Sequence, residues 1–335
     1  MRITLGQLKV MNPKIAAFAK QIGITSVQFN TPHLPVYNNT WKLEDLVALK
    51  KACDAEGLRC EAIENVPIEF YDKVLLGLDG RDEQIENYQQ LIRNMAKAEI
   101  PVLGYHFVPT FVWRTSNTAP GRGGVKVTAF HEADAKKGNT VNYWARTDMA
   151  VPEVEDMWSN YKYFMDAVLP VAKEEGIKLA LHPDDPPVPI VAGVARLFIS
   201  LDAYKRAEQI AGDDGGAWGL DLCLGCVSEM GGAQAVKEFI DYFGPKDRIH
   251  YVHFRDVQGC VPDFQECFLG EGNFDPVAVL KQLHDVGFKG YIMDDHVPAI
   301  DGDIVDPDVG FGYTSHAYEN GYIEGILKAL GCLEY

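Results

Sequence analysis

The chain has 335 residues, of which 47% are hydrophobic, and its formal net charge is −17. This apolar fraction is sufficient for a large buried core, and the length suits two domains or a single α/β barrel, which commonly occupies about 250 residues or more. The acidic charge argues against sequence-independent binding to nucleic acid, because phosphate contacts need a basic surface. An anionic substrate would need local positive charge, from a metal ion or from a few Arg and His side chains.

Neither a membrane span nor a disulfide framework is expected. No apolar stretch approaches the roughly 18 residues of a transmembrane helix, and residues 1–5 enter a strand-like segment without the apolar region of a signal peptide. The seven cysteines are odd in number and scattered, which is typical of reduced thiols. We therefore expect a cytoplasmic protein with no membrane or nucleic-acid partner, and a homodimer as the commonest oligomer.

Strand-like and helix-like stretches alternate along the chain. Asn12 and Pro13 are typical of an N-cap and a first helical position. Strands are predicted at 3–8, 26–30, 59–63, 102–107, 177–181, 217–222, 248–252 and 290–293, and helices at 12–21, 42–56, 82–98, 154–175, 201–211, 233–243, 275–286 and 315–330. This alternation predicts one (β/α)₈ TIM-barrel domain over residues 1–335. Nucleotide-binding sheets are disfavoured because no glycine-rich phosphate loop follows the first strand.

One connection is too long for this pattern. Residues 108–152 separate the fourth strand from its helix, and a loop of this length without secondary structure is usually functional or disordered. Its aromatic side chains argue against plain disorder: Phe111, Trp113, Phe130, Tyr143 and Trp144. We expect a lid-like inserted loop over the mouth of the barrel.

Four successive strands end in residue types that bind divalent transition metals. The fifth strand runs into His182, the sixth into Cys223, the seventh into His253 and the eighth into Asp295. In a (β/α)₈ barrel the carboxyl ends of all strands lie on one face, so a single ion could contact all four. Taken singly, each residue could instead be a hydrogen-bonded core histidine, an inert thiol or a turn aspartate.

Other cysteines and histidines lack this placement. Cys226, His250 and Cys260 do not end a strand at the predicted face, and we interpret them as structural. The irregular spacing of the four candidate ligands is unlike a zinc finger and suits a site assembled by the fold.

Several motifs along the chain are specific enough to compare with known families. The most specific is His182-Pro183-Asp184-Asp185-Pro186-Pro187; the others include Glu64-Asn65-Val66-Pro67, Leu76-Gly77-Leu78-Asp79-Gly80-Arg81-Asp82, Phe107-Val108-Pro109, Val252-His253 and Asp295-His296. These motifs resemble those of the D-mannonate dehydratases, a family similar to the xylose-isomerase-like barrels. The resemblance covers most of the chain. It implies that the protein binds Mn²⁺ and converts D-mannonate to 2-keto-3-deoxy-D-gluconate. The implied metal ligands are His182, Cys223, His253 and Asp295, and the implied acid-base residues are His296 and Tyr313.

These residue types suit the dehydration of a sugar acid. A proton must leave the carbon beside a carboxylate, and a divalent ion stabilises the charge that develops. His296 can take or donate a proton near neutral pH, and the hydroxyl of Tyr313 is better suited to donation. The alternatives are a structural role for His296 and a packing role for Tyr313.

Further residues could bind the substrate at the barrel mouth. Arg255 lies two residues beyond His253 and could bind a carboxylate, although an ion pair is an equal alternative. His33, His106 and Glu64 follow or end strands and could bind hydroxyl groups, or could merely satisfy loop amides. Trp113 belongs to the segment that resembles the substrate end of the family's site.

Three departures from the family pattern affect the expected substrate. Met293 stands where the family has arginine, the segment 111–115 is shortened and lacks an aspartate, and Asp221 stands where relatives are not acidic. The substrate could therefore be another sugar acid or a keto sugar. A sugar isomerase or epimerase is the alternative enzyme class, and a non-catalytic sugar-binding barrel is a third reading. The thiolate ligand also leaves Zn²⁺, Fe²⁺ and Co²⁺ as alternatives to Mn²⁺.

Overall fold

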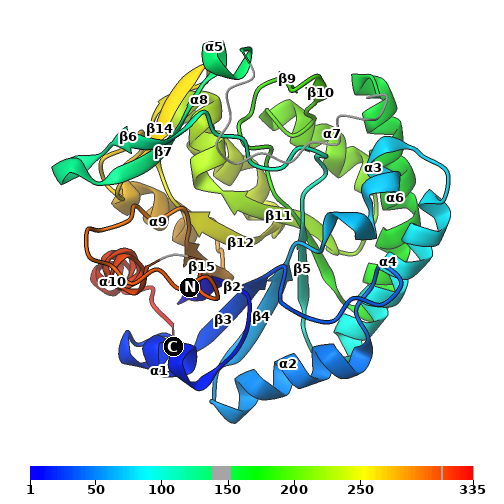
Figure 1. Cartoon of the computed structure of the whole chain (residues 1–335), viewed down its shortest axis with the longest axis horizontal. Helices are drawn as coiled ribbons and strands as arrows, with labels where there is room; N and C mark the ends of the chain where they lie inside the picture. Colours follow the sequence, from blue (N-terminus) through cyan, green and yellow to red (C-terminus); the bar gives the residue numbers. More distant parts are fainter. Residues whose placement is uncertain (138–151, 311, 335) are drawn as a thin grey trace.

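The computed structural model describes residues 1–137, 152–310 and 312–334, and its centre is one parallel sheet (Figure 1). Its strands are β1 (Arg2–Ile3), β2 (Leu5–Leu8), β3 (Ser26–Asn30), β4 (Arg59–Glu64), β5 (Val102–Tyr105), β8 (Lys178–Leu181), β11 (Trp218–Cys223), β12 (Ile249–Phe254) and β15 (Tyr291–Asp294). They pair in the order β1-β15-β12-β11-β8-β5-β4-β3-β2. Because β1 pairs with β15 while β2, in the same first strand, pairs with β3, the sheet closes into a barrel. The predicted TIM barrel is confirmed.

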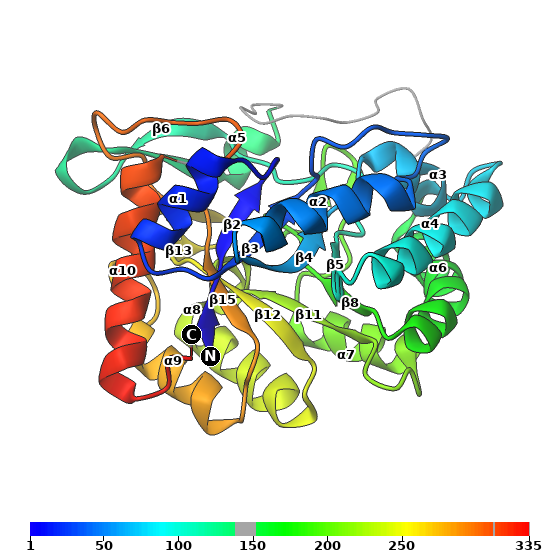
Figure 2. The ribbon, with the colours of Figure 1, turned by 90° about the horizontal axis from the view of Figure 1, so that it is seen from below.

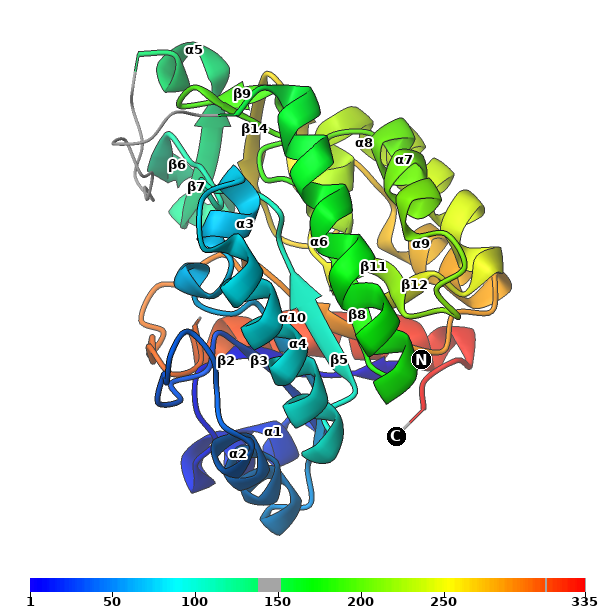
Figure 3. The same cartoon turned by 90° about the vertical axis from the view of Figure 1, so that its right-hand side faces the viewer.

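Helices cover the outside of this barrel (Figures 1 and 3). They are α1 (Pro13–Gln21), α2 (Leu43–Ala55), α3 (Asp72–Leu76), α4 (Arg81–Lys97), α6 (Val154–Glu175), α7 (Leu201–Ala211), α8 (Leu224–Phe243), α9 (Pro276–Asp285) and α10 (Tyr313–Leu330). Asn12 is the N-cap of α1, as predicted, since its side chain accepts a hydrogen bond from the amide of Ile15. No described helix has the length and apolar character that a membrane crossing needs.

Helix α8 is longer than predicted. It begins directly after β11 at Leu224, whereas the sequence predicted a start at residue 233. Gly231 and Gly232 interrupt it with non-helical backbone, and Gly232 has a positive φ of 64°. The predicted helix over 233–243 therefore matches only the part of α8 that follows this interruption.

The barrel interior is filled by side chains from alternate positions of the strands. A layer of buried residues lies inside it: Ala62, Val102, Ala180, Tyr251 and Tyr291. Gly104 leaves room for this layer, because a Cβ there would lie 2.3 Å from the hydroxyl of Tyr251. His253 follows Tyr251 by two residues, so its side chain lies on the same interior face, one step closer to the carboxyl ends.

The insertion is not a loop without secondary structure in its described part. It forms β6 (Ser116–Pro120), β7 (Lys126–His131) and the short α5 (Glu132–Ala135). Strand β7 pairs with β14 (Asp263–Glu266), which pairs with β13 (Val257–Cys260), giving an antiparallel accessory sheet of order β13-β14-β7-β6. Figure 2 shows this region at one end of the barrel, away from the two chain termini. Tyr143 and Trp144 lie outside the described residues, and closure of the insertion as a lid stays a prediction.

Candidate active site

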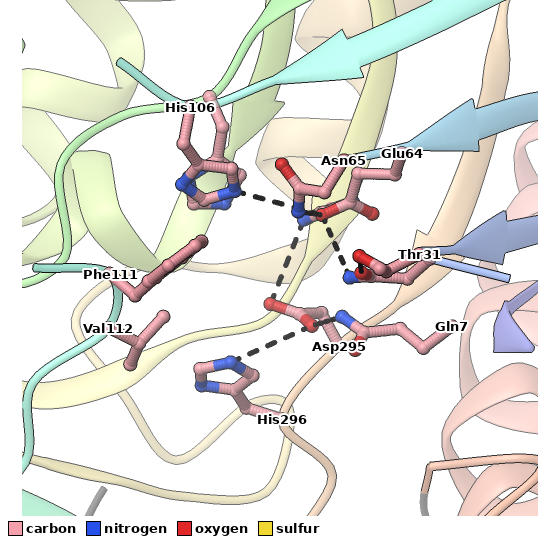
Figure 4. A pocket seen from close by; sticks show the side chains of 12 residues that line it. Gln7, Thr31, Glu64, Asn65, His106, Phe111, Val112, Asp295 and His296 are labelled. Atoms are coloured by element: carbon pink, nitrogen blue, oxygen red, sulfur yellow. Dashed lines mark hydrogen bonds and ion pairs between the residues drawn. The ribbon is translucent and has the colours of Figure 1, made fainter. Parts of the chain in front are cut away.

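A cavity of about 250 Å³ opens at the carboxyl ends of the barrel strands (Figure 4). Residues on or just after β2, β3, β4, β5, β8, β12 and β15 form most of its wall, and the 108–152 insertion adds an apolar side. The lining residues are Gln7, Asn30, Thr31, Glu64, Asn65, His106, Phe111, Val112, His182, His253, Asp295 and His296. The site therefore lies on the face of the barrel where the sequence predicted it.

The backbone around this cavity is unusually strained. Five lining residues that are not glycine have a positive φ: Gln7 at 62°, Thr31 at 45°, Asn65 at 60°, Phe111 at 52° and His296 at 45°. Such conformations persist only where the surrounding structure enforces them, and they concentrate at functional sites. Thr31 and Asn65 come directly after β3 and β4. The chain thus turns sharply where these strands end, at the cavity wall.

Three of the four predicted metal ligands form one compact group. A nitrogen of His182, the sulfur of Cys223 and a nitrogen of His253 all lie within 4.8 Å of one another, and all three residues are buried. We call these three residues the metal cluster. Asp295 lies beside it, with Oδ2 3.8 Å from Nδ1 of His253. Gln7 and Arg255 donate hydrogen bonds to the Asp295 carboxylate and hold it there.

The protonation of the metal cluster depends on its own members and on the buried groups beside it. Burial alone would raise the pKa of the Cys223 thiol, but a hydrogen bond from Cys226 and the charge of Arg255 hold that pKa well below its usual range. Burial opposes protonation of His182, yet the charges of Asp221 and Cys223 raise its pKa to about 9. In the absence of a cation, the cluster therefore favours a thiolate beside protonated imidazole.

The unsatisfied polar atoms of this region fit a bound cation. Both ring nitrogens of His253 and both carboxylate oxygens of Asp221 are buried and make no well-formed hydrogen bond with the described residues. Buried polar groups are normally satisfied, and buried negative charge needs a positive partner. Imidazole, thiolate and carboxylate are a donor set suited to a divalent transition metal.

Two carboxylates face the other side of the His253 ring. Nε2 lies 3.1 Å from Glu64 and 3.5 Å from Asp221. Burial raises the pKa of Asp221 to about 8, whereas Glu64 accepts a 2.6 Å hydrogen bond from Gln28. Sequence reasoning treated Asp221 only as a departure from the family. Its position two residues before Cys223 on one strand was a usable signal, because such residues share a face.

The predicted acid-base residues are separated. His296 lines the cavity, and its Nδ1 lies 3.0 Å from Oε1 of Glu266. Tyr313 is at the start of α10 and does not line the cavity; its hydroxyl donates a 2.9 Å hydrogen bond to Asp306. The structure places His296 on the cavity wall beside Asp295 and leaves Tyr313 outside that wall.

The predicted substrate-binding residues also divide into two groups. Glu64 and His106 line the cavity, and the His106 ring stacks on that of His182 with centroids 4.1 Å apart. His33 is exposed and faces Asp308, 3.7 Å away. Trp113 is buried in the apolar cluster beneath the accessory sheet. Neither His33 nor Trp113 lines the cavity, and their roles in substrate binding stay predictions.

Arg255 lies behind the cavity in a network that sequence reasoning missed. Its guanidinium is 2.8 Å from Asp185 and 3.0 Å from Glu266. Arg114, from the insertion, binds the same two carboxylates, and all four side chains are buried. We call Arg114, Arg255, Asp185 and Glu266 the arginine cluster. Arg255 is thus neutralised by protein carboxylates, and its predicted contact with a substrate carboxylate stays untested.

Met293 occupies the position where the resemblance leads one to expect arginine. Its side chain is buried in the barrel and packs against Gly6, where a Cβ would lie 1.5 Å from its sulfur. The position therefore contributes an apolar contact and no positive charge. Met293 lies two residues before Asp295 and is not among the residues that line the cavity.

A TIM barrel with a strained, polar cavity and a buried metal cluster at its strand ends defines an enzyme of the α/β-barrel class. The family model for D-mannonate dehydratase (UxuA) matches residues 12–334, and the chain belongs to this family. It is therefore a hydro-lyase of sugar-acid metabolism.

Individual mannonate dehydratases are similar to this chain over nearly its whole length. Mannonate dehydratase 2 of Halalkalibacterium halodurans is 31% identical, with 98% of this chain and 99% of that protein covered. The mannonate dehydratase of Thermotoga neapolitana is 29% identical, covering 92% and 90%. The crystal structure of mannonate dehydratase from Streptococcus suis serotype 2 aligns with a TM-score of 0.85 at 29% identity, covering 100% and 97%. A D-tagatose 3-epimerase-like protein, at 14% identity and a TM-score of 0.61, shares the fold alone.

Proposed function

We propose that this enzyme removes water from D-mannonate to give 2-keto-3-deoxy-D-gluconate, with a divalent cation held by His182, Cys223, His253 and Asp295. The observation that carries the proposal is the buried metal cluster beside Asp295 on the wall of a polar cavity. A bound ion would supply Lewis-acid stabilisation of the charge that develops on the substrate's carboxylate. The family resemblance favours Mn²⁺, and the thiolate also suits Zn²⁺, Fe²⁺ or Co²⁺.

His296 carries the proton transfers in this proposal. Its ring lines the cavity, next to Asp295 in the chain. Burial alone would lower the pKa of His296, but the Asp295 carboxylate raises it above its ordinary value. The neutral ring can take the C2 proton and the charged ring can donate to the departing C3 hydroxyl. For Tyr313 to donate instead, its hydroxyl would have to leave Asp306 and turn toward the cavity.

The remaining wall supplies groups that bind and orient a polyhydroxy acid. Thr31 and Asn65 offer a hydroxyl and an amide group on one side of the cavity, and His106, the residue after β5, lies across from them (Figure 4). Asn30 adds a second amide to the wall. Phe111 and Val112, from the insertion, form an apolar side that excludes water. Polar groups in such a cavity fix orientation, and apolar ones strengthen the electrostatic interactions around the reacting atoms.

The test is product formation with purified protein. The enzyme is incubated with D-mannonate and Mn²⁺, and in parallel with EDTA, and the 2-keto-3-deoxy acid is identified by mass spectrometry. We expect product with Mn²⁺ and none with EDTA. Absence of product with every divalent metal would contradict the dehydratase proposal. A panel of other hexonates, aldoses and ketoses then distinguishes another sugar acid from the isomerase or epimerase alternative.

A further inference from the structure

Glu266 contacts the proposed acid-base histidine from outside the barrel. It ends β14 of the accessory sheet, and its side chain is 3% exposed. Its Oε1 lies 3.0 Å from Nδ1 of His296, 2.8 Å from a guanidinium nitrogen of Arg114 and 3.0 Å from one of Arg255. The two arginines hold this carboxylate in place, and the same oxygen also faces the His296 ring.

This arrangement specifies where the histidine carries its proton. An ionised carboxylate can only accept hydrogen bonds, so the nitrogen that faces it must be the donor. Burial alone would raise the pKa of Glu266, but Arg255 and His296 lower it to about 2, which keeps the carboxylate ionised. Nδ1 of His296 therefore carries hydrogen. Nε2 lies across the ring, on the side of Asp295, 3.9 Å from Oδ1 (Figure 4).

We infer that Glu266 is a positioning residue: it binds the Nδ1 hydrogen of His296 and so presents Nε2 to the cavity as the atom that exchanges a proton with the substrate. A histidine in the wrong tautomer, or turned away, cannot perform this exchange. The inference rests on the function proposed above for His296. It also gives the accessory sheet a part in catalysis, since β14 supplies Glu266 and the insertion supplies Arg114.

The alternative is that Glu266 only neutralises the two arginines. Glu229 offers a matched control, because it is fully buried and lies 3.1 Å from Arg255 and 3.8 Å from Arg114, whereas the carboxylate that faces Nδ1 of His296 is that of Glu266. The variants Glu266→Gln and Glu229→Gln each replace a carboxyl group that contacts the same two arginines with an amide of the same size. Burial raises the pKa of Glu229 well above its usual range, so Glu229→Gln tests the loss of a carboxyl contact to the arginines. Only Glu266→Gln weakens the carboxylate that orients His296.

The experiment compares kcat, KM and metal content of the Mn²⁺-loaded variants with D-mannonate. We expect Glu266→Gln to lower kcat about 100-fold, the size of a general acid-base contribution, with KM changed less than about threefold and metal content unchanged. Glu229→Gln should stay within about threefold of wild type in kcat. Equal losses of kcat in both variants, or loss of metal from Glu266→Gln, would overturn the positioning role.

A second measurement needs no variant of Glu266 and no turnover. In protein labelled with ¹⁵N-histidine, and assigned with His296→Gln, the side-chain shifts report which ring nitrogen of His296 is protonated. We expect a protonated Nδ1 in metal-free and Mg²⁺-loaded protein, and a His296 ring protonated only at Nε2 would refute the inference. Failure of D-mannonate turnover alone would instead count against the proposed function, because the nitrogen shifts do not depend on the substrate.

Discussion

Two buried polar clusters lie on either side of Asp295, and they are satisfied in opposite ways. In the arginine cluster, Arg114 and Arg255 neutralise Asp185 and Glu266 through several hydrogen bonds. In and beside the metal cluster, the ring nitrogens of His253 and the oxygens of Asp221 make no well-formed hydrogen bond with the described residues. Both regions are equally inaccessible to solvent, so exposure does not explain the difference.

The difference lies in the source of positive charge. The arginine cluster contains two permanent cations for its carboxylates, and such a network is complete without a ligand. The metal cluster lies beside the carboxylates of Glu64, Asp221 and Asp295 and adds a thiolate to them. The histidines offset these groups, and the one arginine that reaches Asp295, Arg255, is shared with the carboxylates of the arginine cluster. A buried site that is short of positive charge requires a cation from outside, whereas a self-neutralised one supports the structure around it.

The largest expected effect follows from removing the Cys223 thiolate from the metal cluster. We expect Cys223→Ala to lose stoichiometric Mn²⁺ binding and to lower kcat/KM about 10³-fold, because metal stabilisation of the developing charge is worth several kcal/mol. Cys53→Ala is the control, since Cys53 is also a buried free thiol but lies on α2 and outside the metal cluster. Metal content by mass spectrometry and titration calorimetry measure the effect. Full metal binding by Cys223→Ala would show that Cys223 is not a ligand.

The same substitution in the two regions should have opposite effects on stability. Asp185→Asn removes a carboxylate that both arginines share, and it should lower the free energy of unfolding by about 3 to 5 kcal/mol. Asp221→Asn removes an acid without well-formed hydrogen bonds whose pKa burial raises to about 8, so the metal-free protein at pH 7 should be at least as stable as wild type.

Urea unfolding in EDTA measures both variants under identical conditions. A loss of several kcal/mol in Asp221→Asn would mean that Asp221 is satisfied in the metal-free protein, and the contrast between the clusters would fail. The measurement is repeated with Mn²⁺, because a ligand that binds only the folded state adds a free energy of unfolding that grows with the logarithm of its concentration divided by Kd.

The sequence predicted the barrel and the metal cluster because both depend on local patterns. Strand β3 and helices α6 and α7 have the predicted bounds, since apolar periodicity and polar end residues mark them. A strand end is also a local feature. Parallel strands then bring His182, Cys223 and His253 together without further information.

The arginine cluster and the accessory sheet depend on pairings that no local pattern encodes. Arg114 and Glu266 are separated by 152 positions in the chain, and β7 pairs with β14 over a comparable distance. Tyr313 and His33, which the sequence predicted to act in the site, do not line the cavity. Their positions also depend on contacts between distant parts of the chain. Their orientation depends on Asp306 and Asp308, in a connection whose path the sequence did not predict.

A third buried polar region lies between Asp294, the neighbour of Asp295 in the chain, and helix α10. Asp295 faces the cavity, while Asp294 points outward to α10, where its Oδ2 lies 2.6 Å from Nδ1 of His316. One turn along α10, Glu319 is buried, and burial together with the charge of Asp294 raises its pKa to about 8. Glu319 should therefore be protonated at neutral pH. Here a proton neutralises the buried acid, whereas arginines do so in the arginine cluster and a bound cation would do so in the metal cluster.

This proton makes stability depend on pH with a definite sign. The pKa of Glu319 is about 8 in the folded chain and about 4.3 in the unfolded chain, so between these values the folded state binds more protons. The free energy of unfolding should then fall as the pH rises from 6 to 8, by on the order of 1 kcal/mol per pH unit. In Glu319→Gln this contribution disappears, and the variant should be more stable than wild type at pH 8.

Urea unfolding at pH 6, 7 and 8 measures the free energy of unfolding of wild type and Glu319→Gln. The control is Glu324→Gln, which removes a partly exposed carboxylate paired with Lys328 on the same helix. Equal pH slopes in wild type and Glu319→Gln would show that Glu319 is ionised in the folded protein and that a cation or water stabilises it there.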